Sequence, residues 1–175
     1  MNSRIPVHLD FIVDKLTNSI QNTISGDSFA TEVLRLTRID LKQVTKKKGW
    51  NFDWKSELED NAKEVFKLTI PNNPGIIQGL LSLSFETDHV YIHLLENAPF
   101  NIGQRKLYEG VAGNLVAHAC KVSFQQGFEG FVGFTAKTKL IEHYKKTLGA
   151  FTLSGQRMII PTQSAQALID KYYKT

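Results

Sequence analysis

Hydrophobic residues near the start of the chain recur at helical spacing. They are Leu9, Ile12, Val13, Leu16, Ile20 and Ile24. This i, i+3, i+4 rhythm predicts an amphipathic helix over about residues 8–23, which ends near Gly26. Farther along, Val33-Leu34-Arg35-Leu36-Thr37 is rich in apolar and β-branched residues and predicts a strand.

The polar stretch 41–63 has two interpretations. Trp50, Phe52 and Trp54 alternate along it, which allows a short strand with the three rings on one face. The alternative is a loop anchored by these rings, followed by a helix from Trp54 to Lys63. In either case, packing in the core or in a lid explains the aromatic residues.

From residue 64 the pattern changes to strands. Residues 65–70, 76–85 and 89–95 are mainly apolar, and turn-forming residues separate them at 71–75 and 86–88. Three consecutive strands joined by short turns predict an antiparallel meander.

Small residues are concentrated just after the third strand. Pro99 removes a backbone donor, so we expect the strand to end or bulge within Glu96–Pro99. The stretch Glu109-Gly110-Val111-Ala112-Gly113-Asn114 then precedes a long apolar segment. If a helix starts here, its free N–H groups and its positive dipole end form an anion site. A tight turn with close helix packing also explains these glycines and is favoured when they are taken alone, so the flanking residues must decide.

The remaining pattern alternates helices and strands. A helix is expected at 110–126, a buried strand at 128–134, a helix at 136–147, a hairpin of 151–153 with 158–160, and a helix at 164–173. This order predicts an α/β (mixed α+β) protein in which a mixed, mostly antiparallel sheet is flanked by helices. The length fits one domain over residues 1–175, with the N-terminal helix as an addition.

Composition narrows the possible partners. The net charge of +4 is too small for a nucleic-acid-binding surface, and Lys46–Lys48 is the only dense basic run. No apolar run reaches the roughly 20 residues of a membrane span. The single cysteine, Cys120, lies in an apolar run and is expected to be a buried thiol. We therefore expect a cytoplasmic protein without a membrane or nucleic-acid partner.

The order of elements and three local motifs resemble the GNAT superfamily of acyl-CoA-dependent N-acetyltransferases. The phosphate loop of that family follows the pattern Q/R-x-x-G-x-G/A. Here Leu107–Ala112 matches at Gly110 and at the last small residue, whereas Leu107 replaces the first polar residue. The run Tyr144–Phe151 is similar to the end of the family's next helix, with one extra residue before the phenylalanine. A bulge within Glu96–Pro99 would match the family's broken strand.

The resemblance implies an enzyme that transfers an acetyl group from acetyl-CoA to an amine by direct attack. In this family the glycine loop binds the diphosphate, and the broken strand contacts the pantetheine arm and the thioester carbonyl. The tyrosine protonates the departing thiolate, which makes Tyr144 the candidate general acid. The cofactor-binding residues implied are Leu95, Glu96, Asn97, Glu109, Gly110, Val111, Ala112, Gly113, Asn114 and Tyr144. No pair of side chains has the spacing of a metal site.

The general base remains open between three residues. Glu96 is the first candidate, because it lies at the end of the third strand, and His93 and Glu86 are its rivals. Side chains alternate along a strand, so Tyr91 and His93 share one face. Glu96 joins the opposite face, that of Val90, unless a bulge re-aims it.

Two functions fit these motifs. One is an acetyl-CoA-dependent N-acetyltransferase whose acceptor is a small-molecule or protein amine that the sequence does not identify. The other is a non-catalytic GNAT-fold module that binds an acyl-CoA or another anion, which the departure at Leu107 motivates. Exposed edge strands near the C-terminus are also able to pair across a homodimer.

Overall fold

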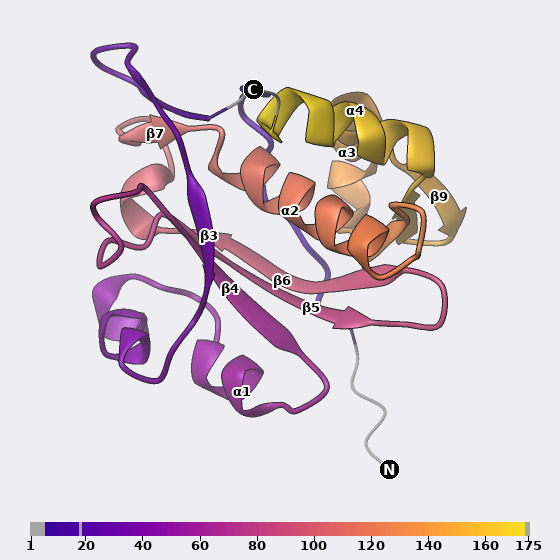
Figure 1. Cartoon of the computed structure of the whole chain (residues 1–175), viewed down its shortest axis with the longest axis horizontal. Helices are drawn as coiled ribbons and strands as arrows, with labels where there is room; N and C mark the ends of the chain where they lie inside the picture. The colour runs from indigo at the N-terminus through magenta and orange to yellow at the C-terminus, as the bar shows by residue number, and fades with distance from the viewer. Residues whose placement is uncertain (1–5, 18, 174–175) are drawn as a thin grey trace.

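The computed structural model describes residues 6–17 and 19–173. Its main sheet has seven strands in the order β3-β4-β5-β6-β8-β10-β9 (Figure 1). All neighbouring strands are antiparallel except β6 and β8, which are parallel. The strands are β3 (Glu32–Arg35), β4 (Glu64–Thr69), β5 (Gly79–Phe85), β6 (Val90–Asn97), β8 (Val132–Thr135), β9 (Phe151–Ser154) and β10 (Arg157–Ile160).

Helices cover both faces of this sheet. Helices α2 (Val111–Gln125), α3 (Ile141–Leu148) and α4 (Thr162–Tyr173) lie on one face, and α1 (Trp54–Glu59) lies on the other (Figure 1). Short 3-10 helices at Asp40–Gln43 and Lys46–Lys48 precede α1, and another at Thr138–Leu140 leads into α3. The mixed sheet flanked by helices confirms the predicted fold class.

The predicted meander is present as β4, β5 and β6. As expected, β6 ends just before Pro99, which begins a 3-10 helix at Pro99–Asn101. The bulge, however, was predicted in the wrong place. The register shifts from Leu83 opposite Ile92 to Ser82 opposite Leu94, so His93 is the extra residue. Proline ends this strand without disturbing the pairs before it, because Gly79 still pairs with Asn97.

Two other boundaries differ from the sequence pattern. The helical interpretation of the 41–63 stretch holds only for α1, which Asp53 caps by accepting a 3.1 Å bond from the N–H of Ser56. The buried strand expected at 128–134 is β8, which starts at Val132. Residues 128–131 form a turn instead, with positive φ angles at Glu129 and Gly130.

A small second sheet joins the N-terminal region to the start of α2. Strand β1 (Ile20–Asn22) pairs with β2 (Ser28–Phe29) on one side and with β7 (Tyr108–Glu109) on the other. The sequence pattern did not predict this hairpin. It fixes the chain at residue 20 next to Gly110.

The helix predicted over residues 8–23 is wrong. Leu9, Phe11 and Val13 are buried, whereas Asp10 and Ile12 between them are exposed. Burial at every second residue belongs to an extended chain rather than a helix. A tertiary contact favours the extended conformation over the helix, because Leu9 forms a parallel bridge with Ala136 just after β8. Within the described residues, no helix is long and apolar enough to cross a membrane.

Candidate active site

The central parallel pair of strands separates after two residues. Val90 pairs with Val132 and Tyr91 with Gly133, and no further β6–β8 pair occurs in the described part of the chain. From Ile92 onwards, the edge of β6 that faces β8 therefore borders a cleft. A broken ladder leaves backbone donors and acceptors to be satisfied by something else.

Helix α2 begins beside this cleft with an unusual N-terminus. Gly110 precedes it with φ of +94°, and within the described residues no side chain caps the helix. The amides of Val111, Ala112 and Gly113 have no carbonyl partner inside the helix, because a helix satisfies only later N–H groups. The Gly110 N–H donates to Asp14 Oδ1 at 3.0 Å. Several aligned amides at a helix N-terminus make an anion-binding site.

The flanking residues of the glycine stretch are engaged within the protein. The N–H of Asn114 donates to the Gly110 carbonyl at 3.1 Å, and its side-chain Nδ2 donates to the same oxygen at 2.8 Å. Glu109 lies in β7, paired with Gln21. Of the six residues predicted for the diphosphate, the four from Gly110 to Gly113 form the turn and first helical residues.

Tyr144 is completely buried on α3 and its hydroxyl reaches the cleft. The hydroxyl donates to the Phe11 carbonyl at 2.7 Å, and the ring lies edge-on to Phe134 at 5.2 Å. Burial raises the pKa of Tyr144, and the negative charge of Asp10 raises it further. The hydroxyl is therefore protonated at neutral pH and able to donate a proton or a hydrogen bond.

Glu96 points toward α1, because the bulge at His93 re-aims it away from the face of Val90. Its carboxylate accepts three bonds, from the N–H of Asn51 at 2.7 Å, from the N–H of Phe52 at 3.3 Å, and from Trp54 Nε1 at 2.8 Å. The residue is almost fully buried. Glu96 thus ties the end of β6 to the segment before α1.

The two rival bases lie together on the α1 side of the sheet. His93 Nε2 lies 2.7 Å from Ser84 Oγ, which donates to Glu86 Oε2 at 2.7 Å. Burial lowers the pKa of His93, and the positive charge of Lys63 lowers it further. These residues border a cavity of about 570 Å³ that also includes Glu57 of α1.

The N-terminal segment fills part of the cleft, which the sequence pattern did not reveal. A cavity of about 390 Å³ remains, with Phe11 and Asp14 on one side and the β6 residues Leu95, Glu96 and Asn97 on the other. Asp14 Oδ2 also pairs with Lys106 Nζ at 3.0 Å. The alternation of Leu9, Phe11 and Val13 was the only signal for this extended path.

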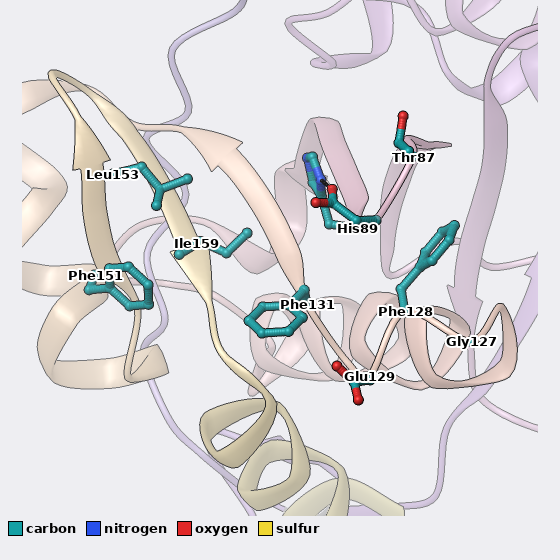
Figure 2. Close-up of a pocket in the computed structure, with 10 residues that line it drawn as sticks. Thr87, His89, Gly127, Phe128, Glu129, Phe131, Phe151, Leu153 and Ile159 are labelled. Atoms are coloured by element: carbon teal, nitrogen blue, oxygen red, sulfur yellow. Dashed lines mark hydrogen bonds and ion pairs between the residues drawn. The ribbon is translucent and has the colours of Figure 1, made fainter.

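A larger cavity of about 670 Å³ lies at the opposite end of β6 (Figure 2). Phe128, Phe131 and Phe151 line it, and Leu153 of β9 is 56% exposed at its edge. His89 is the nearest imidazole, and it lies 2.9 Å from an Arg157 nitrogen. None of the residues predicted for catalysis or cofactor binding borders this cavity.

The remaining chemical groups show no second centre in the part of the chain that is described. No cluster of three or more histidine, cysteine, aspartate or glutamate side chains there is arranged to hold a metal ion. Cys120 is completely buried, and burial raises the pKa of its thiol.

Neither the family models nor the curated protein sequences matched this chain. Several solved structures are similar to it. The AtaT toxin, in a mutant form bound to acetyl-CoA and the C-terminus of the antitoxin AtaR, is 20% identical with a TM-score of 0.55. The alignment covers 79% of this chain and 97% of the toxin.

Two further structures have the same fold. The spermidine/spermine N-acetyltransferase SpeG from Vibrio cholerae is 16% identical, covers 79% of this chain and 96% of its own, and has a TM-score of 0.54. A ribosomal-protein alanine N-acetyltransferase from Escherichia coli is 15% identical, with coverage of 74% and 90% and a TM-score of 0.51. This chain therefore has the fold of the GNAT superfamily of N-acetyltransferases, as its sequence motifs predicted.

Proposed function

We propose that this protein is an N-acetyltransferase that moves an acetyl group from acetyl-CoA to an amine. The observation that carries the proposal is the opening between β6 and β8 beside an uncapped helix N-terminus, with a buried tyrosine hydroxyl at the opening. Two structural neighbours with the same fold are named as N-acetyltransferases, and a third, the AtaT toxin, was solved with acetyl-CoA.

The residues around the cleft suit the parts of the cofactor. The amides from Gly110 to Gly113 would hold the diphosphate, with charge supplied by the helix dipole. The edge of β6 from Leu95 to Asn97 would pair with the amides of the pantetheine arm, as a strand pairs with a strand. Tyr144 would donate its proton to the thiolate that leaves when the amine attacks the thioester carbonyl.

The geometry favours His93 over Glu96 as the group that takes the proton from the attacking amine. Three N–H donors already occupy the Glu96 carboxylate, which suits a residue that positions the end of β6. His93 borders the open cavity on the α1 side, and Ser84 links it to Glu86. Its lowered pKa keeps the imidazole neutral at pH 7, as a base requires.

The acceptor would enter from the α1 side. Glu57, Asp60 and Glu86 border the cavity there together with Lys63 and Arg157. Lys63 pairs with Glu57 at 3.0 Å and with Asp60 at 3.7 Å, so the three carboxylates exceed the two cationic groups by one negative charge, which favours a cationic amine. Neighbouring proteins are named for a polyamine and for the alanine of a ribosomal protein. We therefore place a small polyamine or a protein amine among the acceptors to be tested first.

The direct test measures acetyl-CoA binding by calorimetry and acetyl transfer to a panel of amines by mass spectrometry. Gly110→Glu places a carboxylate at the diphosphate site, and we expect binding to weaken about a hundredfold through like-charge repulsion. A side chain at Gly110 also lies 2.8 Å from Thr17 Oγ1 and 3.0 Å from the Ser19 carbonyl oxygen, so thermal melting checks that this variant still folds. Gly127→Glu is the control for the added charge alone. It adds the same charge at the other end of α2, also at a positive φ, and no described atom lies within 4 Å of its Cβ position. Equal binding by both variants would contradict the proposed diphosphate site.

The second candidate function is a non-catalytic module that binds an acyl-CoA or another anion. It is favoured by the chain's own N-terminal segment lying in the cleft and by Leu107 in place of a polar residue. Thermal stabilisation by coenzyme A, combined with no transfer to any amine of the panel, would select it over the enzyme.

A further inference from the structure

The N-terminal segment, residues 6–17, crosses the sheet through the opening between β6 and β8 (Figure 1). At one end, Pro6 and Val7 border the cavity that contains His93. At the other end, Asp14 reaches the start of α2. The segment therefore runs from the proposed acceptor side to the proposed diphosphate site, along the whole path that a bound acetyl-CoA would take.

Within the opening the segment behaves as an extra strand beside β8. The Leu9 N–H donates to the Thr135 carbonyl at 2.7 Å, and the Leu9 carbonyl accepts from the Lys137 N–H at 3.0 Å. The Val13 N–H donates to His143 Nε2 at 3.0 Å. The two Leu9 bonds satisfy backbone groups at the end of β8 and just after it, and the Val13 bond ties the segment to α3.

Asp14 takes the place of an anion at the glycine turn. One carboxylate oxygen accepts from the Gly110 N–H and the other pairs with Lys106 Nζ, each at 3.0 Å. An N–H at a helix start and a lysine ammonium are the donors that a phosphate group uses. A diphosphate and the Asp14 carboxylate would compete for these donors and would repel each other.

Phe11 blocks the proposed general acid. Its carbonyl accepts the Tyr144 hydroxyl, and its ring packs against the Tyr144 ring with centroids 4.8 Å apart. While this bond is present, the hydroxyl has no proton to offer to a thiolate. The segment thus occupies one of the proposed diphosphate amides, that of Gly110, together with Lys106 and the proton donor Tyr144.

The segment is tethered beside the site that it fills. Strand β1 starts at Ile20 and pairs with β7, which directly precedes Gly110. A tether this short keeps the segment at a high effective concentration in the cleft. Leu9, Phe11 and Val13 hold the segment by burial, whereas Ile12 is 51% exposed and the Asp10–Lys137 ion pair lies at the surface, where such pairs contribute little.

We propose that residues 6–17 occupy the acetyl-CoA cleft in cis, and that acetyl-CoA binds only when this segment moves out. The inference rests on the proposed function, since it names what competes with the cofactor at the same site. In the closed state the protein neither binds acetyl-CoA nor transfers its acetyl group. Any factor that draws the segment away from the cleft activates it.

The test compares three full-length proteins by calorimetry with acetyl-CoA. Asp14→Asn keeps an oxygen that can accept from Gly110 but removes the competing charge. We expect it to bind acetyl-CoA about tenfold more tightly than the unaltered protein, which corresponds to about 1.4 kcal/mol. Asp27→Asn is the control, because it makes the same charge change on the exposed turn between β1 and β2. We expect it to bind like the unaltered protein.

Amide hydrogen exchange follows the segment itself. The Leu9 and Val13 amides are hydrogen-bonded in the cleft, and we expect saturating acetyl-CoA to speed their exchange at least tenfold. The Leu36 amide, bonded to the Val65 carbonyl away from the cleft, serves as the internal reference.

The outcomes separate this inference from the proposed function. Tighter binding by Asp14→Asn together with faster exchange at Leu9 and Val13 supports it. If all three proteins bind acetyl-CoA equally and both amides stay protected, the cofactor binds beside the segment. That result overturns the inference and leaves the proposed function intact. If none of the three proteins binds acetyl-CoA or transfers an acetyl group, both are overturned.

Discussion

The two ends of strand β6 differ in the size of the cavity beside them and in the chemical groups that border it. At its start, Val90 and Tyr91 pair with β8, and a cavity of about 670 Å³ lies close by. At its far end the pairing has stopped, and the cavity beside it has only about 390 Å³. The smaller cavity is nevertheless the one that borders Glu96 and Asp14, and Asp14 accepts a hydrogen bond from Gly110 just before α2.

The difference shows that the proposed site rests on the interrupted ladder and not on the larger cavity volume. Paired strands satisfy their own backbone groups. The larger cavity is lined by side chains, among them the rings of Phe128, Phe131 and Phe151 (Figure 2). Its imidazole, His89, already contacts Asp88 and Arg157. At the open end, backbone groups and side chains must find partners outside the sheet, and there the chain's own segment provides them.

The largest effect is expected from Tyr144→Phe at the open end. Loss of the proton donor should lower kcat about a hundredfold or more, the range for a general acid, while acetyl-CoA still binds. Steady-state kinetics and calorimetry measure the two effects separately. Tyr173→Phe removes a hydroxyl on α4, outside the cleft, and should leave kcat unchanged. Equal kcat values in both variants would show that the Tyr144 ring packs in the core and that its hydroxyl takes no part in the transfer.

A smaller effect is expected from His93→Gln, which should lower kcat/KM about tenfold to a hundredfold. Burial lowers the pKa of His93 below its ordinary 6.5, so the neutral base persists below that pH. We expect kcat/KM to stay level as the pH falls to 6.5 and to decrease only at lower pH, where the imidazole becomes protonated. In His93→Gln this acid limb should disappear.

His89→Gln provides the comparison, because it removes an imidazole from the residue just before β6, next to the paired end of the strand. Its rate and its acid limb should equal those of the unaltered protein. An acid limb that survives in His93→Gln would remove His93 as the base and return the assignment to Glu96 or Glu86.

The smallest effect is expected from Leu153→Ser at the edge of the larger cavity. The side chain is more than half exposed, so the free energy of unfolding should change by about 0.5 kcal/mol or less. Acetyl transfer should stay within twofold of the unaltered rate. Urea denaturation and the transfer assay check these values, and a clear loss of transfer would place this cavity inside the active site.

Much of the fold was readable from the sequence, because the deciding signals are local. The mainly apolar runs of β4, β5 and β6, separated by turn-forming residues, predicted the meander, and the small residues from Gly110 predicted the start of α2. Gly155 marked the hairpin of β9 and β10. Each of these features depends on residues a few positions apart.

The candidate site was readable only in part. The positions of Gly110 and Tyr144 followed from motifs, whereas the direction of Glu96 depended on a bulge at His93 that no residue type announces. The grouping of His93, Ser84 and Glu86 followed from pairing between β5 and β6 across their hairpin.

By itself, the sequence determined the order of the elements and the position of the glycine turn. The spacing of hydrophobic residues and the backbone freedom of glycine depend only on residues that are close in sequence. Only the tertiary structure decided the path of the first residues. Leu9 and Val13 fit a helix as well as a strand, and the open edge of β8 selected the strand. The bond between Asp14 and Gly110 joins residues 96 positions apart. No local pattern encodes such a contact, since it exists only after the sheet has opened between β6 and β8.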